Sequence, residues 1–597
     1  MSRFYYKSCK FCLLLVLLTS ILALNYAALG DEPKICKYGE KMPTKLQGPF
    51  VSIANGGILA VEKTEVHTSY DQGQTWESKQ ILDPEKYLDE DVRAIVRTRE
   101  GTIIFAFMNK KEMQQGKDGW GKGSVDDWII PCYIITSTDE GKTWSEPLQI
   151  QKRWCGALRC MIQLTSGRVV LVAQDIEPWT HVTLTYVSDD QGKTWQKSNT
   201  LRLGGFGDHA GAMEATIVER RDQSLYMLIR TTKGNFYESI STDEGLTWSE
   251  PTDSGIQNNY CCGTLCRLKD GRIALLWNQD SEIPPYNCTQ ITKTDKRDEL
   301  AIAFSEDDAK TWSNPVVVAT KYLLPHEEWG RSRVAYPWLF EIEPGTFWIT
   351  TMQDGDNPLR MVIKEEDIFR LAKEQEQLKQ TEKRVVFMGD TAAAYGGRMT
   401  NYTYLLKVHF KENNSNIRIV YAAKVGRTTE EAKSQFEQDV VEKKPDMLVI
   451  QFGLDDAARD IKANSPDAAP RVSESDFEAN LKYFVHWAKE NKIPVILMTS
   501  NTIRWCEDTV KRYGKISCDL KDQPNVNETS LARYNEITRK VAADEGVQLV
   551  DVWQMYEGFR KEEGEDAMLK YFQPGLMRPN NRAHQLIKDK LLPLIKF

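Results

Sequence analysis

STDEGKTW, at residues 137–144, is one of five copies of the same eight-residue pattern in this chain. Each copy reads Ser-x-Asp-x-Gly-x-Thr-Trp, with Ala in place of Gly in the last. The Ser and Asp side chains can hydrogen-bond the backbone of a hairpin turn, where Gly supplies a left-handed conformation. The Trp ring can be buried between neighbouring sheets. The other copies are residues 69–76 (SYDQGQTW), 188–195 (SDDQGKTW), 241–248 (STDEGLTW) and 305–312 (SEDDAKTW).

Repetition at this spacing indicates an array of similar sheet units. From about residue 35 to residue 363, short β-branched runs such as 168–173 (RVVLVA) and 273–277 (IALLW) alternate with turn clusters, which is typical of an all-β region. At roughly 55 residues per four-stranded unit, this length predicts a six-bladed β-propeller, so one blade lacks a copy of the pattern. Because the pattern builds turns, we expect none of its aspartates to be catalytic.

Composition and charge restrict the class of protein. A chain of 597 residues with 41% hydrophobic content can bury at least two cores. The net charge is -8 and no basic stripe is present, which argues against a nucleic-acid partner. Residues 1–30 have the basic, apolar and small-residue order of a secretory signal, and their apolar run is short for a membrane span. We therefore expect a secreted or periplasmic protein with no membrane span in the mature chain.

The cysteines are compatible with an exported protein. Ten of the twelve lie beyond the signal, an even number that permits disulfides in an oxidising compartment. Cys506 and Cys518 are the only two in the C-terminal half, which makes them the candidate disulfide. Cys261, Cys262 and Cys266 have no His among them, so disulfides or buried thiols are favoured over a metal site. No calcium, zinc or nucleotide motif is present, so we expect no metal and no cofactor.

The sequence pattern changes after the β-rich region. We assign residues 1–30 to the signal, 31–363 to the propeller, 364–383 to a charged helical linker and 384–597 to a second domain. In that domain, expected strands alternate with expected helices, which predicts a doubly wound α/β fold. The strands are residues 385–390, 447–453, 494–500 and 547–552, and the helices are 429–443, 477–491, 533–544 and 581–591.

The repeated pattern is the Asp box of sialidase-like propellers, and residues 213–248 resemble the exo-sialidase superfamily. In that family a Glu precedes an Arg by some fifteen residues, just before an Asp box, and Glu214 and Arg230 match this order. A planar Arg fork can clamp a sugar carboxylate with two hydrogen bonds. A tyrosine is a poor nucleophile unless a neighbouring Glu takes its proton, and the family uses such a pair in place of two carboxylates.

The resemblance implies a role for each matching residue. Glu214 would activate a tyrosine, and Arg230 would bind the substrate carboxylate. Tyr336 is the best nucleophile candidate, Arg297 fits a second carboxylate-binding position, and Arg333 is the fallback. Other roles stay open from the residues alone: Tyr336 as a packed aromatic, Arg297 as a solvated charge, and Glu214 as a turn cap.

Part of the family's site has no direct counterpart in the propeller sequence. The family opens with an Arg-Ile-Pro strand and a loop bearing the acid Asp, whereas residues 48–69 contain no Arg and no Asp. Arg93, one blade later, is a possible substitute for the Arg. Asp126 is our candidate acid, with Asp118 and Asp127 as neighbouring alternatives. His209 could face the same pocket as a substrate-binding residue, or could be a hydrogen-bonded structural residue.

Residues 385–397 (VVFMGDTAAAYGG) resemble the opening block of SGNH/GDSL esterases, and Gly426 fits the second block. The residues that carry the reaction differ from the family pattern. Thr391 stands at the nucleophile position, Asp455 at the oxyanion-hole Asn and Arg578 at the catalytic His. A Thr without a base is not a usable nucleophile, and a carboxylate would repel the developing oxyanion. We therefore expect a catalytically degenerate esterase-like domain.

Two functional hypotheses follow. The first is a secreted glycoside hydrolase of the exo-sialidase type, which releases a terminal sialic acid or related acidic sugar with retention through Tyr336 and Glu214. The second is a catalytically weak glycan-binding protein. In both, the partner is a glycan or glycoconjugate with a terminal acidic sugar. The missing Arg favours the second hypothesis, and the intact spacing of Glu214 and Arg230 favours the first.

Overall fold

The computed structural model describes eleven stretches of the chain, and the account below is confined to them. Several sequence-predicted positions lie outside these stretches: the signal at residues 1–30, His209, Arg333, Thr391, Arg578, Cys506 and Cys518. The described residues are 32–89, 93–205, 210–279, 297–322, 334–352, 357–390, 392–393, 401–458, 469–502, 526–564 and 579–597.

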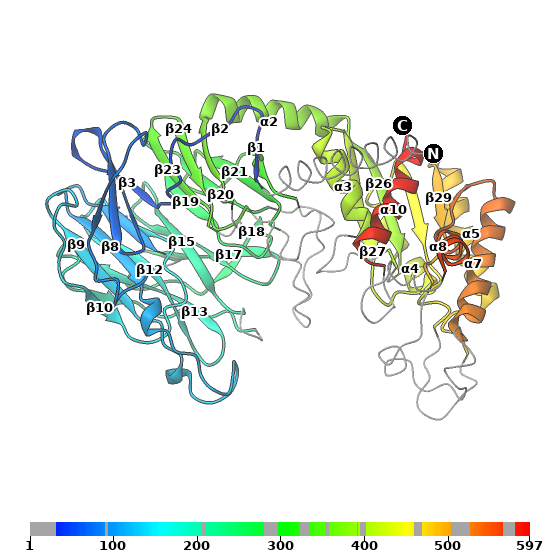
Figure 1. Cartoon of the computed structure of the whole chain (residues 1–597), viewed down its shortest axis with the longest axis horizontal. Coiled ribbons are helices and arrows are strands. Elements are labelled where there is room, and N and C mark those ends of the chain that lie inside the picture. The colour runs from blue at the N-terminus through cyan, green and yellow to red at the C-terminus, as the bar shows by residue number, and fades with distance from the viewer. Residues whose placement is uncertain are drawn as a thin grey trace, which may run out of the picture. The chain divides into compact units, whose positions relative to one another are not determined.

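The chain divides into two compact units, one running through Gln375 and one beginning at Glu376. The first is a propeller of six antiparallel sheets (Figure 1). Its first three blades run in chain order from the innermost strand outward. They are β3 (Phe50–Ser52), β4 (Ile58–Glu62), β5 (Glu65–Ser69) and β6 (Glu77–Gln80); β7 (Ala94–Arg97), β8 (Ile103–Met108), β9 (Cys132–Ser137) and β10 (Leu148–Gln151); and β11 (Met161–Gln163), β12 (Val169–Ile176), β13 (His181–Ser188) and β14 (Gln196–Lys197).

The last two blades take their outermost strands from the N-terminal part of the chain. β1 (Lys34–Ile35) pairs with β22, and β2 (Glu40–Lys41) pairs with β25. The remaining strands of these three blades are β15 (Met213–Glu219), β16 (Leu225–Arg230), β17 (Asn235–Ser241) and β18 (Thr252–Gln257); β19 (Thr264–Arg267), β20 (Ile273–Trp277), β21 (Glu299–Ser305) and β22 (Val316–Thr320); and β23 (Trp338–Glu343), β24 (Thr346–Thr350) and β25 (Arg360–Lys364).

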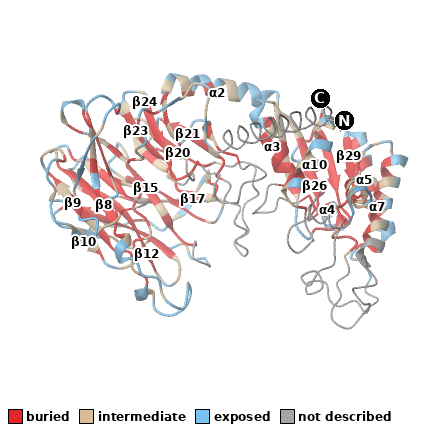
Figure 2. Ribbon diagram, in the orientation of Figure 1, coloured by how far each residue is buried: buried red, intermediate tan, exposed pale blue. Residues whose placement is uncertain are grey.

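The six innermost strands close a ring. Each of β3, β7, β11, β15 and β19 contacts the innermost strand of the next blade, and β23 contacts β3. The second strands are buried along their whole length in β8, β12 and β20 (Figure 2). Neighbouring blades cover both faces of these strands, which explains why their sequences are continuous apolar runs instead of alternating ones.

Every Asp box forms the hairpin between the third and fourth strands of a blade. In the fourth box, Ser241 Oγ donates to Asp243 Oδ1 (2.9 Å), and Thr247 donates to Asp243 through its backbone N (2.8 Å) and its Oγ1 (2.6 Å). These hydrogen bonds overcome burial and lower the pKa of Asp243. The sixth blade has no box because its fourth strand, β2, comes from the N-terminal part of the chain, so no hairpin connects it to β25.

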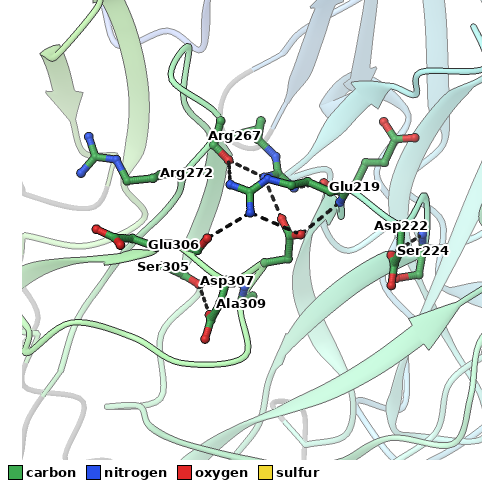
Figure 3. Close-up of polar contacts among 12 residues, drawn as sticks. Glu219, Asp222, Ser224, Arg267, Arg272, Ser305, Glu306, Asp307 and Ala309 are labelled. Atoms are coloured by element: carbon green, nitrogen blue, oxygen red, sulfur yellow. Dashed lines mark hydrogen bonds and ion pairs between the residues drawn. The ribbon is translucent and has the colours of Figure 1, made fainter.

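Box five also takes part in a polar network that links two blades (Figure 3). Arg267, at the end of β19, donates to Asp308 Oδ1 (2.9 Å) and to the backbone oxygen of Glu219 at the end of β15. Arg221 donates to the backbone oxygen of Glu306 (3.0 Å). Since strands alternate in direction, the boxes lie at the opposite end of the blades from the starts of the innermost strands.

The second unit is a five-stranded parallel sheet of order β27-β26-β28-β29-β30, with helices between the strands. This is the order of a doubly wound sheet with a flavodoxin-like switch point. α2 (Glu365–Gln380) precedes it, and no described helix has the length and apolarity needed to cross a membrane. The strands are β26 (Lys383–Gly389), β27 (Ile417–Ala423), β28 (Met447–Gln451), β29 (Val495–Met498) and β30 (Gln548–Val550). The helices are α3 (Tyr402–Glu412), α4 (Thr429–Ser434), α5 (Glu474–Glu490), α7 (Val526–Asp544), α8 (Val552–Glu563) and α10 (Asn581–Leu591).

The predicted fold class, a six-bladed propeller followed by a doubly wound α/β domain, is confirmed. One expected element differs. The single helix expected over residues 429–443 is α4 followed by a π-helical turn, Glu437–Val441. The buried Phe436 lies between the two, packed in the same hydrophobic cluster as Val440.

Candidate active site

Glu214 stands on a distortion at the start of β15, the innermost strand of the fourth blade. The pairing of β15 with β16 shifts register between Met213 and Thr216, and Glu214 has a φ of 43°. A bulge of this kind re-aims a side chain, and such bulges are frequent next to active sites. The backbone N–H of Glu214 donates to Gln174 Oε1 (3.0 Å) from the neighbouring blade, which fixes the distorted backbone.

Tyr336 comes from the sixth blade and meets Glu214 directly. The Tyr336 hydroxyl donates to Glu214 Oε1 at 2.5 Å. Arg230, at the end of β16, donates from Nη1 to the Tyr336 hydroxyl at 2.9 Å and also to Glu214 Oε2. The phenol oxygen is therefore held between a carboxylate that can take its proton and a guanidinium that favours negative charge on it.

Arg297 completes the group of four residues that the sequence singled out. Its side chain is buried, and its Nη2 donates to the backbone oxygen of Tyr260 (2.9 Å). Its guanidinium lies 5.4 Å from the centroid of the Tyr336 ring. The structure thus brings Glu214, Arg230, Arg297 and Tyr336 together, although they belong to three different blades.

Three residues of this site have a strained backbone. Glu214, Tyr260 and Tyr336 have φ values of 43°, 45° and 57°, a region that costs non-glycine residues of order 1–3 kcal/mol each. All three lie at or just before the innermost strand of consecutive blades. Strained residues persist where the surrounding structure over-determines them, and their clustering at one place points to a functional site.

The charges around the Tyr336 phenol change the pKa values of the groups at the site. Burial alone would raise the pKa of Glu214, but the positive charge of Arg230 and hydrogen bonds from Tyr336 and Arg230 lower it. Burial and the charge of Glu214 raise the pKa of Tyr336. Glu214 is therefore the ionised partner and Tyr336 the protonated one, which is the starting state for transfer of the phenol proton to the carboxylate.

Two further site candidates, Arg93 and Asp126, do not join this group. Arg93 is buried, and its Nη1 donates to Asp89 Oδ2 at 2.6 Å while its Nη2 donates to Gln47 Oε1 at 3.0 Å. Asp126 lies in a short helical turn, Val125–Asp127, with a side chain that is 72% exposed and an ion pair to Arg153 at 3.4 Å. Among the described residues, neither forms a hydrogen bond or ion pair with the four.

Sequence reasoning missed four residues of the site: Gln174, Arg159, Tyr260 and Cys261. Gln174 links Glu214 to His181, whose Nδ1 lies 2.7 Å from Gln174 Nε2. Cys261 is fully buried and packs with Tyr336, and its pKa falls to about 6. Burial opposes that change, and a hydrogen bond from Cys262 and the charges of Arg297 and Arg230 outweigh it. Arg159, Tyr260 and Cys261 lie shortly before an innermost strand, and Gln174 lies on β12, so no local motif marks them in the sequence.

An aromatic cluster adjoins His181. The rings of Trp120 and His181 lie 5.1 Å apart, and Trp120 also contacts Trp128 (5.3 Å) and Trp179 (6.1 Å). Through His181 and Gln174, this cluster is connected to the backbone of Glu214. Within the described part of the chain, no group of three or more His, Cys, Asp or Glu side chains is arranged to hold a metal ion.

In the α/β unit, the carboxylates near the switch point of the sheet accept hydrogen bonds from neighbouring groups. Asp390 is buried and accepts hydrogen bonds from the backbone N–H of Ala392 (2.8 Å) and Leu454 (2.8 Å). Asp455 accepts a hydrogen bond from Arg471 at 3.4 Å, and Gly426, just after β27, has a φ of 81°. Burial and the charge of Asp455 raise the pKa of Asp390.

Comparisons with known families agree with this division of the chain. Residues 61–349 match the BNR repeat-like domain, and residues 387–586 match the GDSL-like lipase/acylhydrolase family. The first match falls within the propeller and the second within the α/β unit. Neither match reaches half of the chain.

Individual relatives are distant. An uncharacterized lipoprotein, YqeF, of Bacillus subtilis (strain 168) is 35% identical over 148 residues, which are 24% of this chain and 57% of that protein. A sialidase of Bacteroides fragilis (strain YCH46) is 27% identical over 199 residues, 30% of this chain and 33% of that protein. The chain therefore spans less than two thirds of either relative. A NanB sialidase structure from Streptococcus pneumoniae has 15% identity and a TM-score of 0.38, covering 56% of this chain and 70% of that one.

Proposed function

We propose that this chain, a BNR-repeat propeller followed by a GDSL-like domain, is a retaining glycoside hydrolase that releases a terminal sialic acid or related acidic sugar. The observation that carries the proposal is the Tyr336 hydroxyl, which is hydrogen-bonded to the ionised Glu214 and to Arg230 on a strained backbone. A tyrosine held in this way is activated by an adjacent base, as a nucleophile requires.

The reaction would proceed in two displacements. In the first, Tyr336 Oη attacks the anomeric carbon while its proton passes to Glu214, and the bond to the leaving group breaks as Asp126 protonates the departing oxygen. In the second, Asp126 takes a proton from water, whose oxygen displaces Tyr336, and Glu214 returns the proton to the phenolate. Two inversions give net retention. Arg230 and Arg297 would bind the sugar carboxylate.

The test is release of free sugar acid from a mixed panel of sialylated and other acidic glycans, read by mass spectrometry. We expect release by the wild-type chain and loss of release with Glu214→Gln. The chain offers a matched control, because Tyr226 Oη donates to Glu238 Oε2 (2.8 Å) in the same blade, with no arginine donating to that phenol among the described residues. Glu238→Gln should retain release. Equal losses in both variants, or release by Glu214→Gln, would contradict the proposal.

The second candidate is a glycan-binding protein without hydrolytic activity. It is favoured by the separation of Asp126 from the phenol, because among the described residues no second carboxylate contacts Tyr336. Binding of the panel without release of any sugar would support it and exclude the Tyr336 mechanism. For location we propose the cell envelope or the exterior, in line with the expected signal and with relatives named as a lipoprotein and a sialidase.

The α/β unit is proposed as a binding or support module. Its relatives by family are lipases and acylhydrolases, but Thr391, Asp455 and Arg578 replace the residues on which that chemistry depends. The ion pair of Asp455 with Arg471 supports this proposal, because a carboxylate with its own cation cannot act as an oxyanion-hole donor.

A further inference from the structure

Arg159 occupies the third blade at the position just before its innermost strand, β11, and it contacts the proposed nucleophile. Its side chain is 5% exposed. The guanidinium carbon lies 4.7 Å from the centroid of the Trp338 ring and 5.5 Å from that of the Tyr336 ring. Its Nη2 donates to the backbone oxygen of Pro337 at 2.6 Å. Arg159 therefore contacts the residues on both sides of the Tyr336–Pro337 peptide bond.

The charge of Arg159 has no counter-charge among the described residues. Its Nε and Nη1 are buried without a hydrogen-bond partner, and no described carboxylate lies within ion-pair distance. Buried arginines are normally paired, because an isolated buried charge is costly. Arg93, which immediately precedes the innermost strand of the second blade, has Asp89 at 2.6 Å with both side chains buried. An isolated buried charge does not stabilise the fold, so this difference from Arg93 indicates that Arg159 has a role other than stability.

The position of the Arg159 guanidinium beside the Tyr336 ring indicates how its charge acts. When Glu214 takes the phenol proton, negative charge appears on Tyr336, and the positive charge of Arg159, 5.5 Å from the centroid of the ring, favours this state. With Arg230 and Arg297, Arg159 is one of three cations that contact Tyr336, whose hydroxyl donates to Glu214. Such a site attracts an anionic substrate. Residues 48–69 lack the arginine that the family resemblance predicts there, so another blade would have to supply this charge.

We propose that Arg159 is a positioning residue for Tyr336. It fixes the strained Tyr336–Pro337 segment through the Pro337 carbonyl, and its unneutralised charge favours both the anionic form of the phenol and a bound substrate anion. This inference rests on the proposed function, but part of its test does not depend on catalysis.

The experiment compares Arg159→Met, Arg159→Lys and Arg93→Met in the full chain. We expect Arg159→Met to lower kcat/KM about 10- to 100-fold, as estimated for the loss of a unit charge several ångströms away at an effective dielectric constant of about 20. Its Tm should not fall, because an unpaired buried charge is replaced by an apolar side chain. Arg159→Lys should recover part of the rate. Arg93→Met should lower Tm by several degrees, because it removes the buried cation that forms an ion pair with Asp89.

Binding of free N-acetylneuraminic acid, measured by calorimetry with its neutral methyl ester as control, separates this inference from the proposed function. We expect Arg159→Met to weaken binding of the acid about tenfold. If the wild-type chain binds the acid but releases no sugar, the hydrolase proposal fails and the binding series still decides the role of Arg159. Equal losses in the Met and Lys variants together with a fall in Tm, or unchanged rates and affinities, would overturn the inference. Absence of any binding or release by the wild-type chain would overturn both.

Discussion

The two units of this protein each bury carboxyl groups, and what surrounds these groups differs between the units. In the propeller, Glu214 faces Arg230 and the Tyr336 hydroxyl, and its pKa is lowered. In the α/β unit, Asp390 faces backbone N–H groups and a second carboxylate, Asp455, and its pKa is raised. The first arrangement keeps a base ionised beside a proton donor, whereas the second uses a carboxyl group to join two loops.

The comparison shows that burial of an ionisable group does not by itself indicate catalysis. Asp456 belongs to the structural group, because its Oδ1 accepts both the backbone N–H (2.8 Å) and the hydroxyl (2.6 Å) of Thr429 at the start of α4. The partners decide the role. A carboxylate beside a cation and a phenol is prepared for proton transfer, whereas one bonded to backbone groups stabilises the fold.

The largest effect should come from removing the phenol hydroxyl. Tyr336→Phe should slow sugar release at least about 10³-fold, because neither displacement can occur without the nucleophile. Tyr226→Phe removes another Tyr–Glu hydrogen bond of the propeller, that to Glu238, and should leave the rate within about twofold. Initial rates on the glycan panel measure both. Retention of more than a tenth of the rate by Tyr336→Phe would show that the site is not catalytic.

Loss of the proposed acid should be selective for the leaving group. Asp126→Asn should slow release from natural glycans by about 10²-fold, because their leaving oxygen needs a proton. It should affect an activated aryl glycoside much less, and Asp127→Asn tests the neighbouring alternative acid in the same way. The ratio of kcat/KM for the two substrates is the measurement. An equal effect on both substrates would remove Asp126 from the mechanism.

The two groups should respond to pH with opposite sign. The lowered pKa of Glu214 means that its contribution to stability is present above its ordinary value and is lost as pH falls through the folded pKa. Burial raises the pKa of Asp456 to about 6, so its contribution is present below its ordinary value and is lost as pH rises through about 6.

Calorimetric scans of the full chain between pH 3 and pH 8 would test this difference. Relative to the wild type, Asp456→Asn should gain stability as pH rises, by about 3 kcal/mol at most. Glu214→Gln should lose stability at pH 7, and the gap should close in acid. A parallel response of the two variants to pH would contradict the comparison.

The Asp boxes offer a smaller test, within the propeller itself. Asp243→Ala removes three hydrogen bonds from a hairpin at the end of the blade opposite the site, and should cost about 1–2 kcal/mol in unfolding free energy. The rate of sugar release should not change. A fall in kcat without a fall in unfolding free energy would show that the boxes contribute to catalysis, although they lie at the end of the blade opposite the site.

The smallest effect is expected in the α/β unit. Asp455→Asn restores the residue type expected at an oxyanion hole, yet it should leave sugar release within about twofold and create no ester hydrolysis, because Thr391 and Arg578 are unchanged. Hydrolysis of an aryl acetate by this variant, above the rate of the wild-type chain, would show that the degenerate site retains usable parts.

Much of the fold could be predicted from the sequence because its signals are local. Each Asp box forms a hairpin within eight residues, and Glu214 and Arg230 meet because they lie on adjacent antiparallel strands, β15 and β16. The sixth blade could not be assigned in the same way, since its outer strand, β2, is distant in sequence from β25. This blade lacks a box because its outer strand is supplied from the other end of the propeller when the ring closes. No local sequence pattern indicates this pairing.

The site was predictable only where a family resemblance or a nearby partner existed. Arg93 was considered as a substitute arginine, yet Asp89, four residues earlier, was a local sign that its charge is already paired. Arg159 and Gln174 were missed because their partners, Pro337 and Glu214, lie on other blades. Their roles depend on how blades are placed around the ring, and this information is not contained in the spacing of residues along the chain.

The pairing of β2 with β25 also determines when the propeller can be completed during translation. At about 5–20 residues per second, a ribosome needs roughly 15 to 60 s to go from the second strand to the one that pairs with it. Throughout that interval, the early blades have no closing partner, and Tyr336 has not been synthesised when Glu214 emerges. The ring of blades can therefore close, and the candidate site can form, only after the strands of the sixth blade have been synthesised.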